Sequence, residues 1–213
     1  MTDETYREET GVEELSDVRL EDLSGELKAA CVRAGWKSLV PVQARAIPYL
    51  LAGRDVMIQS RTGSGKTGAY LLPIMHNIDL QKKAAQALVL VPTRELALQV
   101  AREAQMLAGD TEFKTAVVYG GVGYGAQLEA FRQGAQLVVG TPGRILDHLL
   151  KDTLSLDNLR ILIFDEADRM LSMGFYPDMV KIRKYVPAAK IASSMFSATY
   201  PPQVVRLAGQ FLK

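Results

Sequence analysis

Short apolar runs rich in branched residues alternate with longer amphipathic stretches along most of this 213-residue chain. A short apolar run between turn residues is typical of a buried strand, and apolar residues at helical spacing predict a helix. The repeated order of strand and helix predicts an α/β fold with a mostly parallel central sheet and helices on both faces. The expected strands are 56–59, 87–91, 115–119, 137–140, 161–164 and 191–196, and the expected helices between them are 66–78, 94–107, 126–132, 143–150 and 177–185.

Two further helices are expected before the first strand. One begins at Leu20, where apolar residues take up helical spacing, with Ser24 as a candidate cap and Gly35 as a candidate end. The other covers residues 42–51 and ends near Gly53.

The first 17 residues differ in charge from the rest of the chain. They carry seven acids and one base, whereas residues 18–213 carry 17 acids and 24 bases. We expect an acidic, disordered tail over 1–17 and one globular domain over 18–213. The basic balance of that domain permits nucleic-acid binding without requiring it.

Composition excludes several protein classes. No apolar run approaches the ~20 residues that cross a bilayer, and the acidic start is unlike a secretory signal. The single cysteine, Cys31, excludes an internal disulfide framework and a cysteine-built zinc site. These features predict a cytoplasmic protein.

Six segments rich in glycine, polar or charged residues each follow one of the expected strands. The carboxyl ends of parallel strands lie on one rim of a sheet, and ligands of open α/β sheets bind there. We therefore expect these segments to form one functional region. They are 61–66, 92–95, 120–121, 141–144, 165–168 and 197–199.

The segment from Ser60 to Thr67 reads Ser-Arg-Thr-Gly-Ser-Gly-Lys-Thr and has the pattern of a phosphate-binding loop. Gly63 and Gly65 permit backbone conformations and close approaches that a Cβ would obstruct. Neighbouring amides and the start of the next helix can then face phosphate oxygens, with Lys66 beside them. The hydroxyl of Thr67 is placed to ligate Mg²⁺. A plain glycine-rich turn with a surface lysine is the alternative.

An acidic cluster, Asp165-Glu166-Ala167-Asp168, follows the apolar run 161–164. Asp165 is placed to hold Mg²⁺, directly or through water, and Glu166 to orient and deprotonate an attacking water. Asp168 is expected to couple this segment to neighbouring groups. Alone, the cluster could simply begin a helix, because acids favour helix amino termini. Beside the phosphate loop it indicates nucleoside triphosphate hydrolysis, with Lys66, Asp165 and Glu166 as the catalytic residues.

The acidic cluster spells the sequence that names the DEAD-box RNA helicases, and the phosphate loop resembles that family's A-x-T-G-S-G-K-T with serine for alanine. The resemblance covers residues 18–213 and implies a RecA-like P-loop domain that binds ATP and Mg²⁺. The expected nucleotide-binding residues of the loop are Ser60, Arg61, Thr62, Gly63, Ser64, Gly65, Lys66 and Thr67, and the expected metal ligands are Thr67 and Asp165.

Residues 35–43 resemble the adenine-reading Q motif of the same family. The amide of Gln43 can both donate to and accept from the edge of adenine. The chain departs from the family pattern where Leu39-Val40-Pro41 replaces Pro-Thr-Pro, and where Val18 replaces an aromatic residue that stacks on the base. The nucleotide contacts implied here come from Trp36, Lys37 and Gln43, although packing against the body is an alternative for Trp36.

Three segments resemble the family's RNA-facing motifs, which implies contacts to the sugar–phosphate backbone and little sequence specificity. The same residues also suit ordinary turns, because threonine caps helices and proline favours the first helical position. The expected RNA-binding residues are Pro92, Thr93, Arg94, Glu95, Gly120, Gly121, Thr141, Pro142, Gly143 and Arg144.

Residues 197–199 resemble the family segment that links hydrolysis to strand separation, so the expected coupling residues are Asp168, Ser197, Ala198 and Thr199. The alternative is that this segment caps a helix beginning near Pro201.

The resemblance also implies a second helicase domain, in the same longer chain, that closes over ATP and RNA. The present chain is then the ATP-binding half of an ATP-dependent RNA helicase that unwinds short duplexes or remodels RNA–protein complexes. Alone it should bind nucleotide but be nearly inactive. In related phosphoryl transfers, an arginine supplied by another element raises the reaction rate by about 10³–10⁵-fold. The expected partners are single-stranded or short duplex RNA and that second domain, with no membrane. Two alternatives remain: a DNA helicase or translocase of the same superfamily, and an ATP-binding assembly factor for RNA–protein particles that does not unwind.

Overall fold

The computed structural model describes residues 14–189 and 191–212, and these form a six-stranded sheet whose strands all run parallel. The strand order is β1-β6-β5-β2-β4-β3. Residues 1–13, most of the expected disordered tail, lie outside the described residues. The strands are β1 (Val56–Gln59), β2 (Ala87–Leu90), β3 (Thr115–Val118), β4 (Leu137–Gly140), β5 (Ile161–Asp165) and β6 (Ala192–Ser197).

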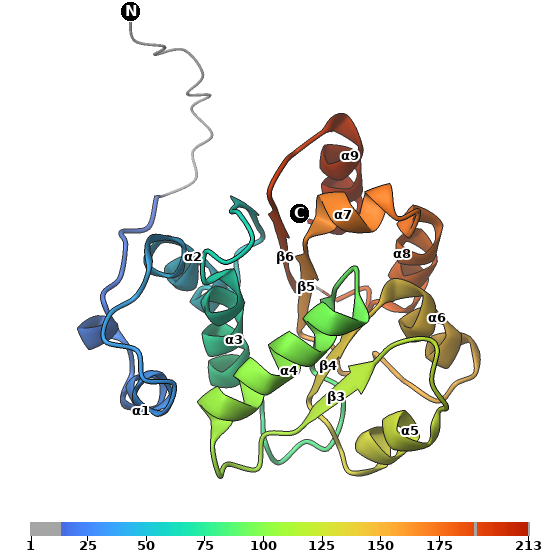
Figure 1. The fold of residues 1–213 in the computed structure, drawn as a ribbon, viewed down its shortest axis with the longest axis horizontal. Coiled ribbons are helices and arrows are strands. Elements are labelled where there is room, and N and C mark those ends of the chain that lie inside the picture. Colours follow the sequence, from blue (N-terminus) through green and yellow to red (C-terminus); the bar gives the residue numbers. More distant parts are fainter. Residues whose placement is uncertain (1–13, 190, 213) are drawn as a thin grey trace, which may run out of the picture.

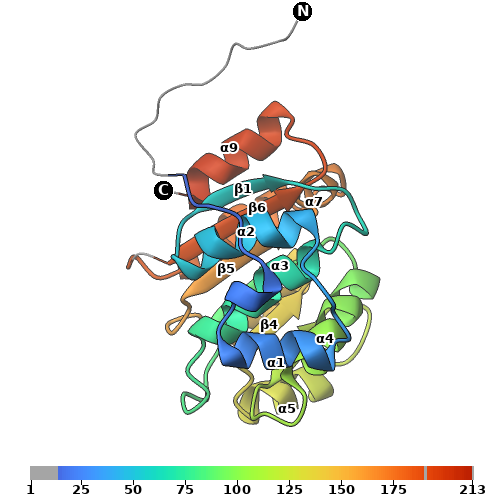
Figure 2. The ribbon, with the colours of Figure 1, turned by 90° about the vertical axis from the view of Figure 1, so that its left-hand side faces the viewer.

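Helices cover both faces of the sheet (Figure 1). One face packs against α1 (Gly25–Arg33), α2 (Pro41–Leu51), α3 (Lys66–Asn77) and α4 (Arg94–Ala108), of which α1, α2 and α3 lie towards the viewer in Figure 2. The other face packs against α6 (Pro142–Leu150), α7 (Ala167–Ser172), α8 (Tyr176–Ile182) and α9 (Pro202–Phe211), while α5 (Gly125–Arg132) lies near β3. Within the described ranges, no helix is both long and apolar enough to span a bilayer.

The central strands are buried on both sides, which explains their uninterrupted apolar sequences. In β2, Ala87 and Val89 pack into the core beneath α1–α4, whereas Leu88 and Leu90 pack into the core beneath α6–α9. The α/β fold with a parallel sheet and two helical layers is therefore confirmed.

The helix expected from Leu20 is interrupted in the structure. A 3-10 turn, η1 (Leu20–Asp22), precedes α1, because Leu23 and Ser24 adopt extended backbone between them. Ser24 is the N-cap of α1, but its side chain makes no capping hydrogen bond. The helix expected over 177–185 likewise ends early, and its last turn is a second 3-10 turn, η2 (Arg183–Tyr185).

Candidate functional site

The strand order brings the phosphate loop and the acidic cluster together. β5 and β1 both flank β6, so the loop after β1 and the acids after β5 emerge on the same rim. The Lys66 Nζ lies 2.8 Å from Asp165 Oδ1 and 3.5 Å from Glu166 Oε1. The two segments are therefore neighbours in space, as the sequence pattern predicts.

The two expected glycines of the loop are required by its geometry. Gly63 and Gly65 have φ of 79° and 86°, in the left-handed region that disfavours side chains. A Cβ on Gly65 would also lie 2.8 Å from Val40 Cγ2, which is closer than carbon atoms pack. Helix α3 begins at Lys66, so the first amides of the helix face the same rim as the loop.

Asp165, the last residue of β5, is fully buried. Burial raises the pKa of its carboxyl, although Lys66 and the Tyr70 hydroxyl oppose that effect. Tyr70 Oη donates to Oδ2 over 2.8 Å. Oδ1 faces the Lys66 ammonium but has no aligned hydrogen-bond donor among the described residues. The buried carboxylate of Asp165 and the buried hydroxyl of Thr67 are oxygen ligands of the kind that a hard divalent cation such as Mg²⁺ prefers.

Glu166 occupies an unusual backbone position at the rim. Its φ and ψ of 58° and 52° are left-handed, which is uncommon for a residue with a side chain and typical of functional sites. Its carboxylate accepts a hydrogen bond from Thr62 Oγ1 at 3.0 Å and pairs with Arg169 Nη1 at 3.3 Å. It lines a cavity of about 490 Å³ with Thr62, Lys66 and Thr199. The strained backbone thus directs a nearly buried acid into an open polar space.

Asp168 connects the acidic cluster to the segment after β6. Its Oδ2 accepts hydrogen bonds from the backbone N of Thr199 at 3.0 Å and from Thr199 Oγ1 at 2.7 Å. Its own backbone N donates to Ser197 Oγ over 3.1 Å. Partial burial would raise the pKa of Asp168, but the hydrogen bonds from Thr199 and Ser197 outweigh it, and the pKa is lowered. The expected coupling residues Asp168, Ser197 and Thr199 are therefore in direct contact, and Ala198 lies between two of them.

Of the three residues expected to read adenine, two pack against other parts of the protein and one is exposed. Gln43 is buried and links α2 to the loop: Val40 N donates to its Oε1, and its Nε2 donates to Gly65 O, each over 3.0 Å. Trp36 packs directly on α3, where a Cβ on Gly68 would come within 2.1 Å of the indole. Lys37 is exposed.

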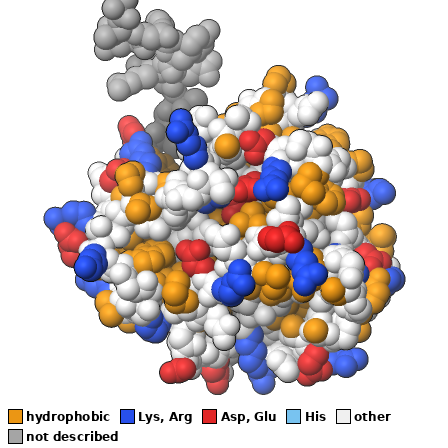
Figure 3. Space-filling view, viewed as in Figure 1, with side chains coloured by type: hydrophobic (Ala, Val, Ile, Leu, Met, Phe, Trp, Pro, Cys, Tyr) orange, Lys and Arg blue, Asp and Glu red, His pale blue; other side chains and the backbone are white. Residues whose placement is uncertain are grey.

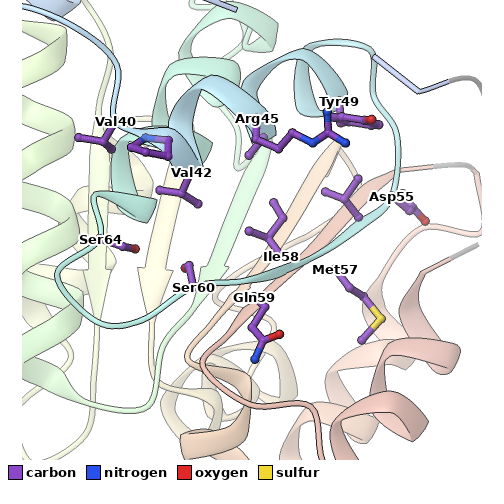
Figure 4. A pocket seen from close by; sticks show the side chains of 13 residues that line it. Val40, Val42, Arg45, Tyr49, Asp55, Met57, Ile58, Gln59, Ser60 and Ser64 are labelled. Carbon is purple, nitrogen blue, oxygen red and sulfur yellow. The ribbon is translucent and has the colours of Figure 1, made fainter. Parts of the chain in front are cut away.

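A cavity of about 960 Å³ lies between α2 and the edge strand β1 (Figure 4). Its walls include the apolar side chains of Val42 and Ile58. Ser60 and Ser64 of the phosphate loop also line it, and neither hydroxyl has a partner within the described part of the chain. The loop therefore separates this largely apolar cavity from the polar cavity that Glu166 lines. The sequence pattern did not predict the apolar cavity.

The expected RNA-binding segments follow β2, β3 and β4, which are neighbours at the other side of the rim. Thr93 caps α4 by accepting from Leu96 N at 3.3 Å, and the exposed Arg94 lies 4.7 Å from the Tyr119 ring centroid. Glu95, Gly120 and Gly121 are exposed, Thr141 and Gly143 are partly buried, and Pro92 and Pro142 are buried. Charges are interspersed on the face seen in Figure 3, so charge alone does not outline a nucleic-acid surface there.

Three residues near the acids have no counterpart in the sequence interpretation: Tyr70, Glu103 and Arg169. Tyr70 and Glu103 lie on the buried sides of α3 and α4, and helical spacing there indicates only packing. Tyr70 contacts an acid 95 residues away, a distance in sequence that no local pattern spans.

Glu103 provides a prediction on stability. Burial, assisted by the nearby charge of Asp165, raises its pKa to about 7. Between the unfolded pKa of 4.5 and about 7, rising pH removes a proton from the unfolded chain but not from the folded one, so Glu103 lowers stability. We expect Glu103→Gln to match the unaltered protein near pH 4.5 and to exceed it at pH 8 by at most about 3 kcal/mol. Urea unfolding at several pH values measures this difference. The exposed Glu112→Gln is the control, and an identical pH dependence in both variants would contradict the prediction.

The sequence profile of the DEAD/DEAH box helicase family matches residues 40–207. The chain is 47% identical over 192 residues to the ATP-dependent RNA helicase DeaD of Escherichia coli K12, covering 88% of this chain and 30% of that protein. It is 42% identical over 190 residues to the ATP-dependent RNA helicase CshA of Limosilactobacillus reuteri, covering 89% of this chain and 38% of that protein. The chain thus spans about a third of the length of these curated relatives.

The fold also resembles a solved structure, that of a DEAD box protein from the hyperthermophile Methanococcus jannaschii. The TM-score is 0.83 and the identity 39%, over 90% of this chain and 52% of that chain.

Proposed function

Because the chain belongs to the DEAD/DEAH box helicase family, we propose that residues 18–213 are the ATP-binding RecA-like domain of an ATP-dependent RNA helicase. The observation that carries this proposal is the contact of Lys66 with Asp165 and Glu166, 2.8 and 3.5 Å away, at the junction of a glycine loop and a helix. The helicase activity is proposed for the longer protein, since the named relatives extend well beyond the matched region.

In this proposal the phosphate loop holds the triphosphate of ATP. The amides of residues 61–67 and the start of α3 donate to phosphate oxygens, and Lys66 leaves its carboxylate partners to contact the β- and γ-phosphates. Thr67 and Asp165 would hold Mg²⁺, partly through water, because a hydroxyl and a carboxylate supply the oxygen ligands that Mg²⁺ prefers, and Lys66 would leave Oδ1 as it moves to the phosphates. The bound Mg²⁺ would neutralise charge that develops on the phosphates.

Glu166 orients the attacking water and accepts its proton. A general base must lie within hydrogen-bond reach of its substrate, and Glu166 lines the polar cavity beside Lys66. Thr62 and Arg169 hold its carboxylate in place. The Asp168–Thr199 contact gives the acids a direct connection to residues 197–199, which we propose carry the state of the nucleotide to the rest of the helicase.

RNA binds at the ends of β2, β4 and β3 in this proposal. Arg94 and the exposed backbone of Gly120 and Gly121 face solvent there, and Thr141 to Arg144 begin the neighbouring helix α6. Contacts to the sugar–phosphate backbone of RNA hold single strands or short duplexes without reading the bases. A second helicase domain completes the site, so this domain alone should bind nucleotide but turn over almost none.

Unwinding by the longer protein tests the proposal. With ATP and Mg²⁺, we expect separation of short RNA duplexes and little separation of matched DNA duplexes. Efficient unwinding of DNA alone would instead support a DNA helicase or translocase. ATP-dependent RNA binding without separation of either duplex would support the assembly-factor alternative.

Nucleotide selectivity gives a separate test of Gln43. The present domain should bind ATP and ADP at least about tenfold more tightly than GTP, a difference of about 1.4 kcal/mol. The amide of Gln43 bonds to Val40 N and Gly65 O, and its second N–H and second lone pair remain for adenine's edge. Equilibrium titration with the three nucleotides measures this ratio. Gln43→Ala should reduce it, and the exposed Gln99→Ala serves as control. Equal affinities for ATP and GTP in the unaltered domain would count against adenine recognition by Gln43.

A further inference from the structure

The glycine-rich loop after β3 is held against helix α6 by Arg144. We call residues 119–124 the Gly-Gly loop. Arg144 Nη2 donates to Val122 O over 2.9 Å, and the guanidinium carbon lies 4.4 Å from the centroid of the Tyr124 ring. Its Nε lies 3.8 Å from Asp147 Oδ2, and the side chain is only 11% exposed. The guanidinium is thus engaged by the loop on one side and by its own helix on the other.

The burial of Arg144 Nη1 bears on whether this side chain can contact phosphate. Nη1 is buried and has no hydrogen-bond partner among residues 14–189 and 191–212. A phosphate at the protein surface therefore cannot reach Nη1 in this arrangement of the Gly-Gly loop. Withdrawing the guanidinium would break the bond to Val122 and the contact with the Tyr124 ring. A lysine could make either contact, but it lacks the planar guanidinium that donates to the carbonyl and stacks on the ring at the same time.

Tyr124 forms the other half of this attachment. Its hydroxyl donates to Asp147 Oδ2 and accepts from Lys151 Nζ. Lys151 Nζ also lies 3.0 Å from Asp147 Oδ1 and 4.2 Å from the Tyr124 ring centroid. The hydrogen bonds from Tyr124 and Lys151 lower the pKa of Asp147, so its carboxylate stays charged at neutral pH. The ring of Tyr124 thus lies close to the cations of Arg144 and Lys151, and its hydroxyl is hydrogen-bonded to Asp147 on α6.

A second attachment holds the loop from the side of α5. The buried Gln127 donates from Nε2 to Tyr119 O at 3.4 Å and to Gly123 O at 3.2 Å, so it contacts both ends of the Gly-Gly loop. Its Oε1 lies 3.1 Å from His148 Nε2, on α6. Burial lowers the pKa of His148, which favours the neutral ring. Gln127 and His148 therefore join α5, the loop and α6.

These attachments bear on the entropy that is lost when the Gly-Gly loop becomes ordered. Glycines at 120, 121 and 123 make its backbone costly to order, since glycine loses more conformational freedom than other residues. A ligand that had to order the loop itself would bind more weakly. A loop already fixed to α6 presents its exposed amides, and those at the start of α6, as one rigid surface.

We propose that Arg144 and Tyr124 are positioning residues that hold the Gly-Gly loop and α6 together for RNA, and that the Arg144 guanidinium itself does not contact phosphate. The inference rests on the proposed binding of RNA at this rim. Phosphate is met by backbone amides of the loop and of α6, and by the exposed Arg94.

Salt dependence of RNA affinity distinguishes positioning from phosphate contact. The logarithm of the RNA association constant falls linearly with the logarithm of the salt concentration. Removing one cation that binds a phosphate of single-stranded RNA makes this slope less steep by about 0.7. In the longer protein, Arg144→Ala and Arg144→Lys should each weaken binding of single-stranded RNA by about tenfold with an unchanged slope. Arg94→Ala should reduce the slope by about 0.7. Tyr124→Phe, which keeps the ring but removes the bonds to Asp147 and Lys151, should weaken binding several-fold with an unchanged slope.

The inference is overturned if Arg144→Ala reduces the slope as Arg94→Ala does and Arg144→Lys restores the affinity. It is also overturned if Arg144→Ala and Tyr124→Phe bind RNA normally while Arg94→Ala does not, an outcome that leaves the proposed RNA surface intact. Normal binding by all of these variants would contradict the RNA surface itself. If thermal unfolding shows that Arg144→Ala does not fold, Tyr124→Phe decides the outcome.

Discussion

Glu166→Gln in the proposed longer helicase should lower ATP turnover by about 10²–10⁴-fold while ATP still binds. Glutamine has nearly the shape of glutamate and can still accept from Thr62, but it cannot take a proton from the attacking water. The left-handed backbone at position 166 should persist, because it is set by the turn from β5 into α7. Nucleotide affinity should stay within a few-fold of the unaltered value.

Phosphate release under saturating RNA and ATP measures this effect, with nucleotide binding measured in parallel. The exposed Glu129→Gln on α5 is the matched control and should leave turnover unchanged. Robust hydrolysis by Glu166→Gln would show that another group accepts the proton. Loss of nucleotide binding together with turnover would show that Glu166 acts in binding.

Lys66→Ala is expected to have two large effects. The loss of a charge-assisted contact worth about 1.5–3 kcal/mol should weaken triphosphate binding by roughly 10–150-fold. The substitution also leaves the buried Asp165 without its cation, which should lower the free energy of unfolding by about 3–5 kcal/mol. This stability loss should shrink as pH falls, because Asp165 can then take up a proton.

Titration calorimetry with ATP and urea unfolding measure the two effects separately. Lys184→Ala removes an exposed lysine and should change neither quantity. Unchanged ATP affinity in a folded Lys66→Ala domain would contradict the assigned phosphate contact. Unchanged stability without nucleotide would show that the Lys66–Asp165 pair contributes nothing net to folding.

The sequence predicts the sheet well because buried parallel strands are continuous apolar runs. The run at 137–140 coincides with β4, and the positions of the rim segments follow from parallel strand order. Helix α7 is not among the expected helices, although a helix start at the acidic cluster is an alternative. Its N-cap is Glu166, a non-glycine residue in a left-handed conformation that local preference disfavours.

The directions in which side chains point at the rim of the sheet could not be predicted from the sequence. The pattern around Arg144 indicates a cation near a helix start, and phosphate binding is the natural hypothesis. In the structure that cation contacts the Tyr124 ring and the carbonyl of Val122, which no local sequence pattern indicates. Likewise, the contact of Gln43 with Gly65 depends on how α2 packs on α3, which the spacing of apolar residues leaves open.

The placement of β5 beside β2 has a consequence for communication along the rim. Phe164 is paired with Leu90, so Asp165 is the lateral neighbour of Val91, two residues before the cap of α4. Adjacent strands lie about 4.8 Å apart. The acids proposed to act in hydrolysis and the residue that leads into α4 therefore lie at the ends of adjacent strands, so a shift of one backbone would bear directly on the other.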